Sequence, residues 1–147
     1  MTSNLFGAAI FGCDGARLSP DERAFFADAN PFGFILFDRN LESADQIRAL
    51  TSELRESVGW TAPVFIDQEG GRVQRLRPPH WRTFAPAMQD AMRENAERVL
   101  ELRYHLIAHE LGGLGIDVNC APLLDVPVPG AHDVIGERAL ARDAKTV

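Results

Sequence analysis

The sequence has 147 residues, of which 46% are hydrophobic, and these numbers suit one globular domain with a buried core. The formal net charge of -6 at pH 7 argues against a nucleic-acid partner, because proteins that bind nucleic acids present basic surfaces. No apolar run approaches the ~20 residues of a membrane-spanning helix, and no basic segment precedes the short apolar stretch near the N-terminus, so we expect neither membrane insertion nor a signal peptide.

Short apolar runs alternate with helical patterns along the chain. The runs, which predict buried strands, cover residues 5–12, 33–37, 63–67 and 115–126, the last continuing into a loop. The helical patterns cover residues 20–30, 44–58 and 88–111. Ser19, Pro20 and Glu22 form a capping box at the start of the first helix, which Pro31 is expected to end.

The two longer helices each carry an apolar stripe. On the second helix, which Ser43 caps, the stripe consists of Ile47, Leu50, Leu54 and Val58, and Gly59 follows. On the third helix it consists of Val99, Leu102, Leu106 and Leu111.

The alternation of strands and helices predicts an α/β fold with a mostly parallel sheet, either doubly wound or a closed barrel. The glycine-rich phosphate motifs of doubly wound folds are missing from the sequence, so a barrel is favoured. A (β/α)₈ barrel usually needs ~250 residues. The sequence therefore predicts the N-terminal half of a (β/α)₈ TIM barrel, with about four parallel strands and covering helices. Asp143 is placed to cap a final helix of one turn, which is not stable alone, so we expect a truncated chain.

The third strand leads into residues 62–76, APVFIDQEGGRVQRL, where acids, glycines and arginines follow one another. Functional groups of α/β barrels gather after the C-terminal ends of strands. There the Asp67 carboxylate could accept paired sugar hydroxyls, and an arginine could donate several hydrogen bonds. A structural alternative is open at this point, in which Asp67, Glu69, Arg72 and Arg75 form a salt-bridged loop.

A second polar set follows the fourth strand, on a loop whose length is typical of functional or disordered segments. Its members are Asn119, Asp125 and Arg138. The adjacent His132 and Asp133 are interpreted as solvated loop residues.

Three further features carry less weight. His105 and His109 have a spacing that can hold a metal, but no third ligand with suitable spacing follows, so we expect a helix-surface pair and no metal site. The basic and aromatic segment 77–84 is interpreted as a structured loop of the site wall, not as a nucleic-acid contact. Cys13 and Cys120 are expected to be reduced, partly buried thiols of a cytoplasmic protein.

Four segments resemble consecutive parts of glycoside hydrolase family 3: GFILFDRN, IDQEGGRVQRL, DVNCAPLLDV and VIGERAL. They are similar in particular to the bacterial cytoplasmic β-N-acetylhexosaminidases of peptidoglycan recycling. Residue by residue, the resemblance implies that Asp67, Arg75 and Arg138 bind the sugar, while Arg72 braces the loop. It further implies retaining hydrolysis of terminal β-linked N-acetylglucosamine from muropeptides, without metal or organic cofactor.

The sequence departs from the family in one large respect. A Lys-His-Phe-Pro-Gly-His-Gly segment, an Asp-Ser/Thr-His dyad and a later aspartate nucleophile, all typical of the family, do not occur in it. We therefore expect residues 1–147 to be a partial family 3 N-terminal catalytic domain, inactive alone, with the catalytic groups beyond Val147. The alternative is a non-catalytic half-barrel that binds sugar or associates with itself through open sheet edges.

Overall fold

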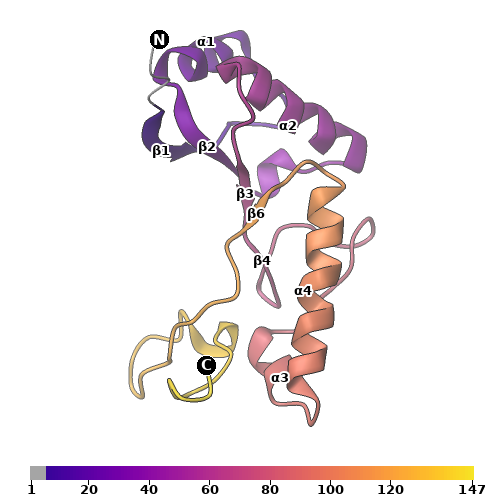
Figure 1. Ribbon diagram of the computed structural model, residues 1–147, viewed down its shortest axis with the longest axis vertical. Helices are drawn as coiled ribbons and strands as arrows, with labels where there is room; N and C mark the ends of the chain where they lie inside the picture. Colours follow the sequence, from indigo (N-terminus) through magenta and orange to yellow (C-terminus); the bar gives the residue numbers. More distant parts are fainter. Residues whose placement is uncertain (1–5) are drawn as a thin grey trace. The chain divides into compact units, whose positions relative to one another are not determined.

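The computed structural model describes residues 6–147, which form two compact units (Figure 1). The first unit runs to Ile66 and includes Leu111–Val118, and the second contains Asp67–Glu110 and Asn119–Val147. In the part of the chain that is described, no helix is long and apolar enough to cross a membrane.

The first unit is built on a sheet whose strands are in sequential order. The order is β1 (Gly7–Phe11), β2 (Pro31–Leu36), β3 (Val64–Ile66) and then β6 (Val118–Asn119). β1 pairs with β2 in parallel, and β2 pairs with β3 in parallel. Each new strand is added on the same side without the reversal of order that marks a doubly wound sheet, so the topology is that of a barrel. The prediction of four parallel strands with helices is confirmed.

Local signals place the two helices of this unit, α1 (Pro20–Ala29) and α2 (Ala44–Val58), correctly. The Ser19 hydroxyl accepts from the Glu22 backbone N–H at 3.2 Å, and the Glu22 carboxylate accepts from the Ser19 N–H at 3.0 Å, which confirms the capping box. Helix α1 ends directly before Pro31, as predicted. Asn30, at φ 40°, ends the helix in the left-handed region, and Pro31 already begins β2.

The capping box gives the first unit a pH-dependent contribution to stability. Burial raises the pKa of Glu22, but hydrogen bonds from the Asp14 and Ser19 backbones and the Ser19 hydroxyl outweigh it, so the pKa is lowered overall. A lowered pKa stabilises the fold above the unfolded-state value, and this contribution is lost as the pH falls through the folded-state value.

We therefore expect Glu22→Gln to lower the free energy of unfolding by about 1 kcal/mol at pH 7. As the pH is lowered from 7 to 3 the difference between variant and parent should shrink, because this contribution is lost as the parent carboxyl takes up its proton. Urea denaturation at both pH values measures this, with Glu56→Gln, an exposed change on α2, as the control. An equal difference at both pH values would contradict the assignment.

The second unit begins with a hairpin that the sequence analysis missed. β4 (Gln68–Gly70) pairs antiparallel with β5 (Val73–Gln74). At the turn, Gly70, the last residue of β4, has φ 96° and Gly71 has φ 58°, values that favour glycine. The double glycine of the motif therefore forms the turn.

The remaining elements of this unit are α3 (Ala87–Ala91), most of α4 (Ala96–Gly112) and a 3₁₀ turn at Gly136–Arg138. The single helix predicted over residues 88–111 is wrong, because four residues break it. The predicted stripe is wrong at Leu102, which is 53% exposed, but Leu111 is buried as predicted. Arg103 and Ile107, which the stripe did not include, are also buried. A charged residue thus occupies a buried position of α4.

Smaller differences concern the strands and the cysteines. The first predicted strand is not buried on both faces, because Ile10 is 43% exposed, and its residue Leu5 lies outside the described residues. The fourth predicted strand is shorter than its apolar run. Both thiols are free, but Cys13 is fully buried and Cys120 is exposed, so the expectation of partial burial is wrong for both. Burial raises the pKa of the Cys13 thiol to about 11.

Candidate functional site

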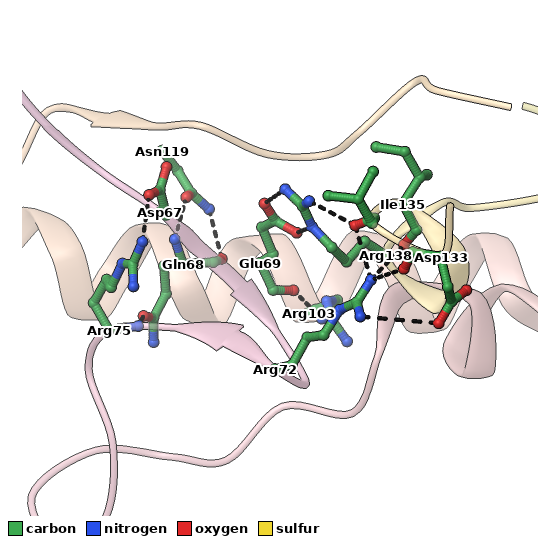
Figure 2. Close-up of polar contacts among 11 residues, drawn as sticks. Asp67, Gln68, Glu69, Arg72, Arg75, Arg103, Asn119, Asp133, Ile135 and Arg138 are labelled. Atoms are coloured by element: carbon green, nitrogen blue, oxygen red, sulfur yellow. Dashed lines mark hydrogen bonds and ion pairs between the residues drawn. The ribbon is translucent and has the colours of Figure 1, made fainter. Parts of the chain in front are cut away.

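The hairpin after β3 carries Asp67 and Arg75 on its two arms, and the structure brings them together. Arg75 Nη2 donates to Asp67 Oδ2 at 2.9 Å (Figure 2). The side chains are 24% and 23% exposed respectively, so the pair is reachable from solvent. Two of the three residues predicted to bind a ligand are therefore neighbours at one accessible edge.

Buried amides fix the position of this pair. Gln68, between Asp67 and Glu69, is 1% exposed, and its Oε1 accepts from the backbone N–H of Arg75 at 3.0 Å. The backbone N–H of Gln68 donates to Asn119 Oδ1 at 2.9 Å, and Asn119 Nδ2 donates back to the Gln68 carbonyl at 3.0 Å. Asn119 of the predicted second polar set is thus a structural support of the hairpin, and Asp125 of that set lies exposed.

Arg138, the third predicted residue, is held by Glu69. Arg138 Nε donates to Glu69 Oε2 at 2.8 Å and Nη2 donates to Oε1 at 2.7 Å, which is a bidentate pair. The Glu69 side chain is only 5% exposed and that of Arg138 is 21% exposed. The hydrogen bonds that Arg138 donates to the Glu69 carboxylate raise the pKa of Arg138 above its usual value, although burial opposes this, and the Asp125 and Asp67 carboxylates add to the rise.

The Arg138 guanidinium keeps donors for a ligand. An arginine carries five N–H groups. Two of them bind Glu69 and one, on Nη1, donates to the Val134 carbonyl at 3.0 Å. Glu69 and Arg138 together therefore form a rigid support from which further N–H groups can reach an acceptor.

Arg72 holds the loop that leads to Arg138. Its Nη2 donates to the carbonyl oxygens of Asp133 at 2.6 Å and Val134 at 2.8 Å. The interpretation that Arg72 braces the loop is confirmed (Figure 2). The loop, residues 126–137, lines a cavity of about 730 Å³ together with Arg72 and Arg142, and His132 and Asp133 are exposed in it, as interpreted from the sequence.

Sequence reasoning missed a buried ion pair behind the hairpin. The Arg103 side chain is 2% exposed, and its Nη1 donates to Asp90 Oδ2 at 2.6 Å. Its Nη2 donates to the carbonyl oxygens of Ala85, at 2.8 Å, and of Glu69. No pattern in the sequence marks this role, because the helical spacing assigned the neighbouring Leu102, which is exposed, to the buried face.

The side chains of the site are suited to binding a polar ligand with several hydroxyl groups. Asp67 directly precedes β4 and Glu69 lies within it, two residues apart around Gln68, a spacing that in extended chain places both side chains on the same side. Each carboxylate has an arginine beside it, and the combination presents acceptors and donors within a small area. Among residues 6–147 no group of three or more His, Cys, Asp and Glu side chains could hold a metal ion, and both His105 and His109 are exposed.

Parallel strands in sequential order, with polar side chains after the third, define this protein as part of an α/β barrel. Residues 10–147 match the glycosyl hydrolase family 3 N terminal domain. The chain therefore belongs to glycosyl hydrolase family 3, and the predicted family is confirmed.

Individual relatives agree with this family. The chain is 42% identical over 139 residues to a β-hexosaminidase of Methylococcus capsulatus, covering 94% of this chain and 41% of that protein. A β-hexosaminidase of Alkalilimnicola ehrlichii is 37% identical, with 92% and 40% covered. The native NagZ structure from Neisseria gonorrhoeae has a TM-score of 0.86 at 27% identity, with 96% of this chain and 42% of that chain covered. The chain thus spans about two-fifths of the length of these relatives.

Proposed function

We propose that this chain supplies the sugar-binding part of a β-N-acetylhexosaminidase that releases terminal, non-reducing β-linked N-acetylglucosamine from peptidoglycan fragments in the cytoplasm. The observation that carries the proposal is the pair Asp67–Arg75 beside the pair Glu69–Arg138 at the end of β3. A solved NagZ from Neisseria gonorrhoeae, similar to this chain with a TM-score of 0.87, is a complex with N-trifluoroacetyl-D-glucosamine. That ligand is of the sugar class proposed here.

In this proposal Asp67 accepts hydrogen bonds from sugar hydroxyls, and Arg75 and Arg138 donate to sugar oxygens. Because the buried Gln68 and Glu69 fix these groups, the sugar would be held in one orientation. Orientation of the glycosidic bond is itself a contribution to the rate in the intact enzyme.

We also propose that the 147 residues alone do not hydrolyse glycosides. A retaining glycosidase needs a nucleophile and a proton donor on opposite sides of the bond, about 5 Å apart. In this proposal Asp67 binds the sugar and Glu69 holds Arg138, so neither fills these roles. The nucleophile and the acid/base dyad of the intact enzyme are placed outside these residues, and no metal or organic cofactor is invoked.

The test is a titration of the chain with N-acetylglucosamine, followed by saturation-transfer NMR. We expect Asp67→Asn to weaken binding about tenfold or more, because the amide loses the charge that strengthens hydrogen bonds to hydroxyls. Asp45→Asn, at a 95% exposed side chain in the first unit, should bind like the parent. Thermal melting must show that both variants are folded.

Equal affinity in the parent and in Asp67→Asn would remove Asp67 from the site. Hydrolysis of an aryl N-acetylglucosaminide by the pure chain, abolished by Asp67→Ala, would overturn the proposed inactivity.

The second candidate is a non-catalytic half-barrel that associates with itself. Large apolar side chains exposed in the first unit favour it: Ile10 is 43% exposed, Phe25 is 54% exposed and Phe32 is 46% exposed. Light scattering tests this candidate: a monomer with a cooperative melt would count against self-association.

A further inference from the structure

We propose that Arg103, buried on α4, is a positioning residue that holds the sugar-binding arginine Arg138 in place through Glu69. The proposal rests on the proposed function, in which Arg138 contacts the sugar. It assigns a functional consequence to a cation whose side chain is only 2% exposed.

The Arg103 guanidinium is fixed from several sides. It forms an ion pair with Asp90 at 2.6 Å and donates to two carbonyl oxygens, those of Ala85 and Glu69. The rings of Phe84 and Tyr104 lie 5.6 and 5.9 Å from its central carbon, within the range of cation–π attraction. A group with this many contacts can serve as a rigid reference for the backbone that it touches.

The contact with Glu69 connects this reference to the site. Arg103 binds the main-chain oxygen of Glu69, and the side chain of the same residue holds Arg138 by two hydrogen bonds (Figure 2). A bidentate pair tolerates little displacement, because both N–H groups must meet both carboxylate oxygens at once. The place of the Glu69 backbone therefore sets the place of the Arg138 guanidinium.

The hairpin needs such an anchor at this end. On one side of Glu69, Gln68 is held by Asn119. On the other side stand Gly70 and Gly71, which have no side chains to fix the turn. A Cβ atom on Gly70 would meet the Arg103 Nη2 atom, so the glycine leaves the space that the guanidinium occupies.

The fork of an arginine is required for this arrangement. Nη1 binds Asp90 while Nη2 binds the two carbonyl groups, so two nitrogens hold separate partners. A lysine ammonium is a single point on a shorter reach and cannot serve both. Arg103→Lys therefore keeps the buried charge but loses part of the anchor.

The readout is the Nε–H of Arg138, observed by NMR in ¹⁵N-labelled chain and assigned by its loss in Arg138→Lys. In the parent this N–H donates to Glu69 at 2.8 Å, so its exchange with water is slow. We expect Arg103→Lys to speed this exchange about tenfold or more and to weaken N-acetylglucosamine binding by a similar factor. Binding is measured by the titration described above, well below the melting temperature.

The matched control is Arg55→Lys in the first unit. The Arg55 guanidinium also binds two carbonyl groups, of Ala62 and Gly115, and one carboxylate, of Asp117. We expect Arg55→Lys to lower the melting temperature without changing the exchange of the Arg138 Nε–H or the sugar affinity.

Unchanged exchange of the Arg138 Nε–H in folded Arg103→Lys, with only a lower melting temperature, overturns the proposal and leaves Arg103 a structural residue. If Arg103→Lys does not fold, Asp90→Asn weakens the same anchor and is judged by the same readout. If exchange rises but the parent chain binds no sugar, the positioning of Arg138 stands and the proposed function fails.

Discussion

Replacing Gly70 with alanine should lower the free energy of unfolding by about 3 kcal/mol or more. Two costs combine in this expectation. The backbone at Gly70 has φ 96°, which side chains rarely adopt. In addition, the new Cβ would meet the Arg103 guanidinium and would lie 2.6 Å from the Ala85 carbonyl oxygen, a backbone atom that cannot swing away.

Urea denaturation followed by circular dichroism measures this loss as a lower midpoint. The control is Gly112→Ala at the end of α4, where an added Cβ has no atom within 4 Å. There we expect no loss and a gain of up to about 0.5 kcal/mol, because alanine restricts the unfolded chain. Equal midpoints for Gly70→Ala and the parent would show that the turn and the guanidinium can adjust.

Replacing Arg138 with methionine should cost about 3 kcal/mol of unfolding free energy, because it strands a carboxylate in the protein. The Glu69 side chain is 5% exposed and has both oxygens bound to the guanidinium. The double variant Glu69→Leu/Arg138→Met should recover most of this loss, since removing both charges of a buried pair is often nearly neutral.

A double-mutant cycle by urea denaturation tests this pair, with Glu69→Leu as the other single variant. The control is Arg98→Met, which breaks the pair with Glu101, whose side chains are 74% and 51% exposed. That change should stay below about 0.5 kcal/mol. Additive losses in the Glu69–Arg138 cycle would mean that the two charges do not depend on each other for stability.

Features decided within a few residues were predictable from the sequence. The caps at Ser19 and Ser43 each depend on hydrogen bonds that span three residues, and both are found as predicted. Gly59, which follows the second helix in the sequence, ends it in the left-handed region. The order of strands and helices was also predictable, because apolar runs and helical stripes alternate clearly in the first unit.

Features decided by distant partners were not predictable. The helical pattern assigned Leu102 to the buried face of α4. Arg103 is buried instead, because its guanidinium binds Asp90 and the Glu69 carbonyl. The role of Glu69 depends on Arg138, which lies 69 residues away in the sequence, and no local pattern predicts this pairing. The resemblance of the motif predicted Asp67, Arg75 and Arg138 as binding residues. The residues that hold them in place were identified only in the structure.

The last segment of the first unit is synthesised late on the ribosome. Leu111–Val118 belongs to this unit but leaves the ribosome after the whole of Asp67–Glu110. Until then the Thr51 hydroxyl cannot donate to the Leu114 carbonyl, which it contacts at 3.1 Å, and Arg55 lacks Asp117, its partner at 2.8 Å. At ~5–20 residues per second this delay lasts on the order of several seconds. During that time the edge of β3 stays open, and a nascent chain that stalls before Leu111 presents chaperones with an unfinished sheet.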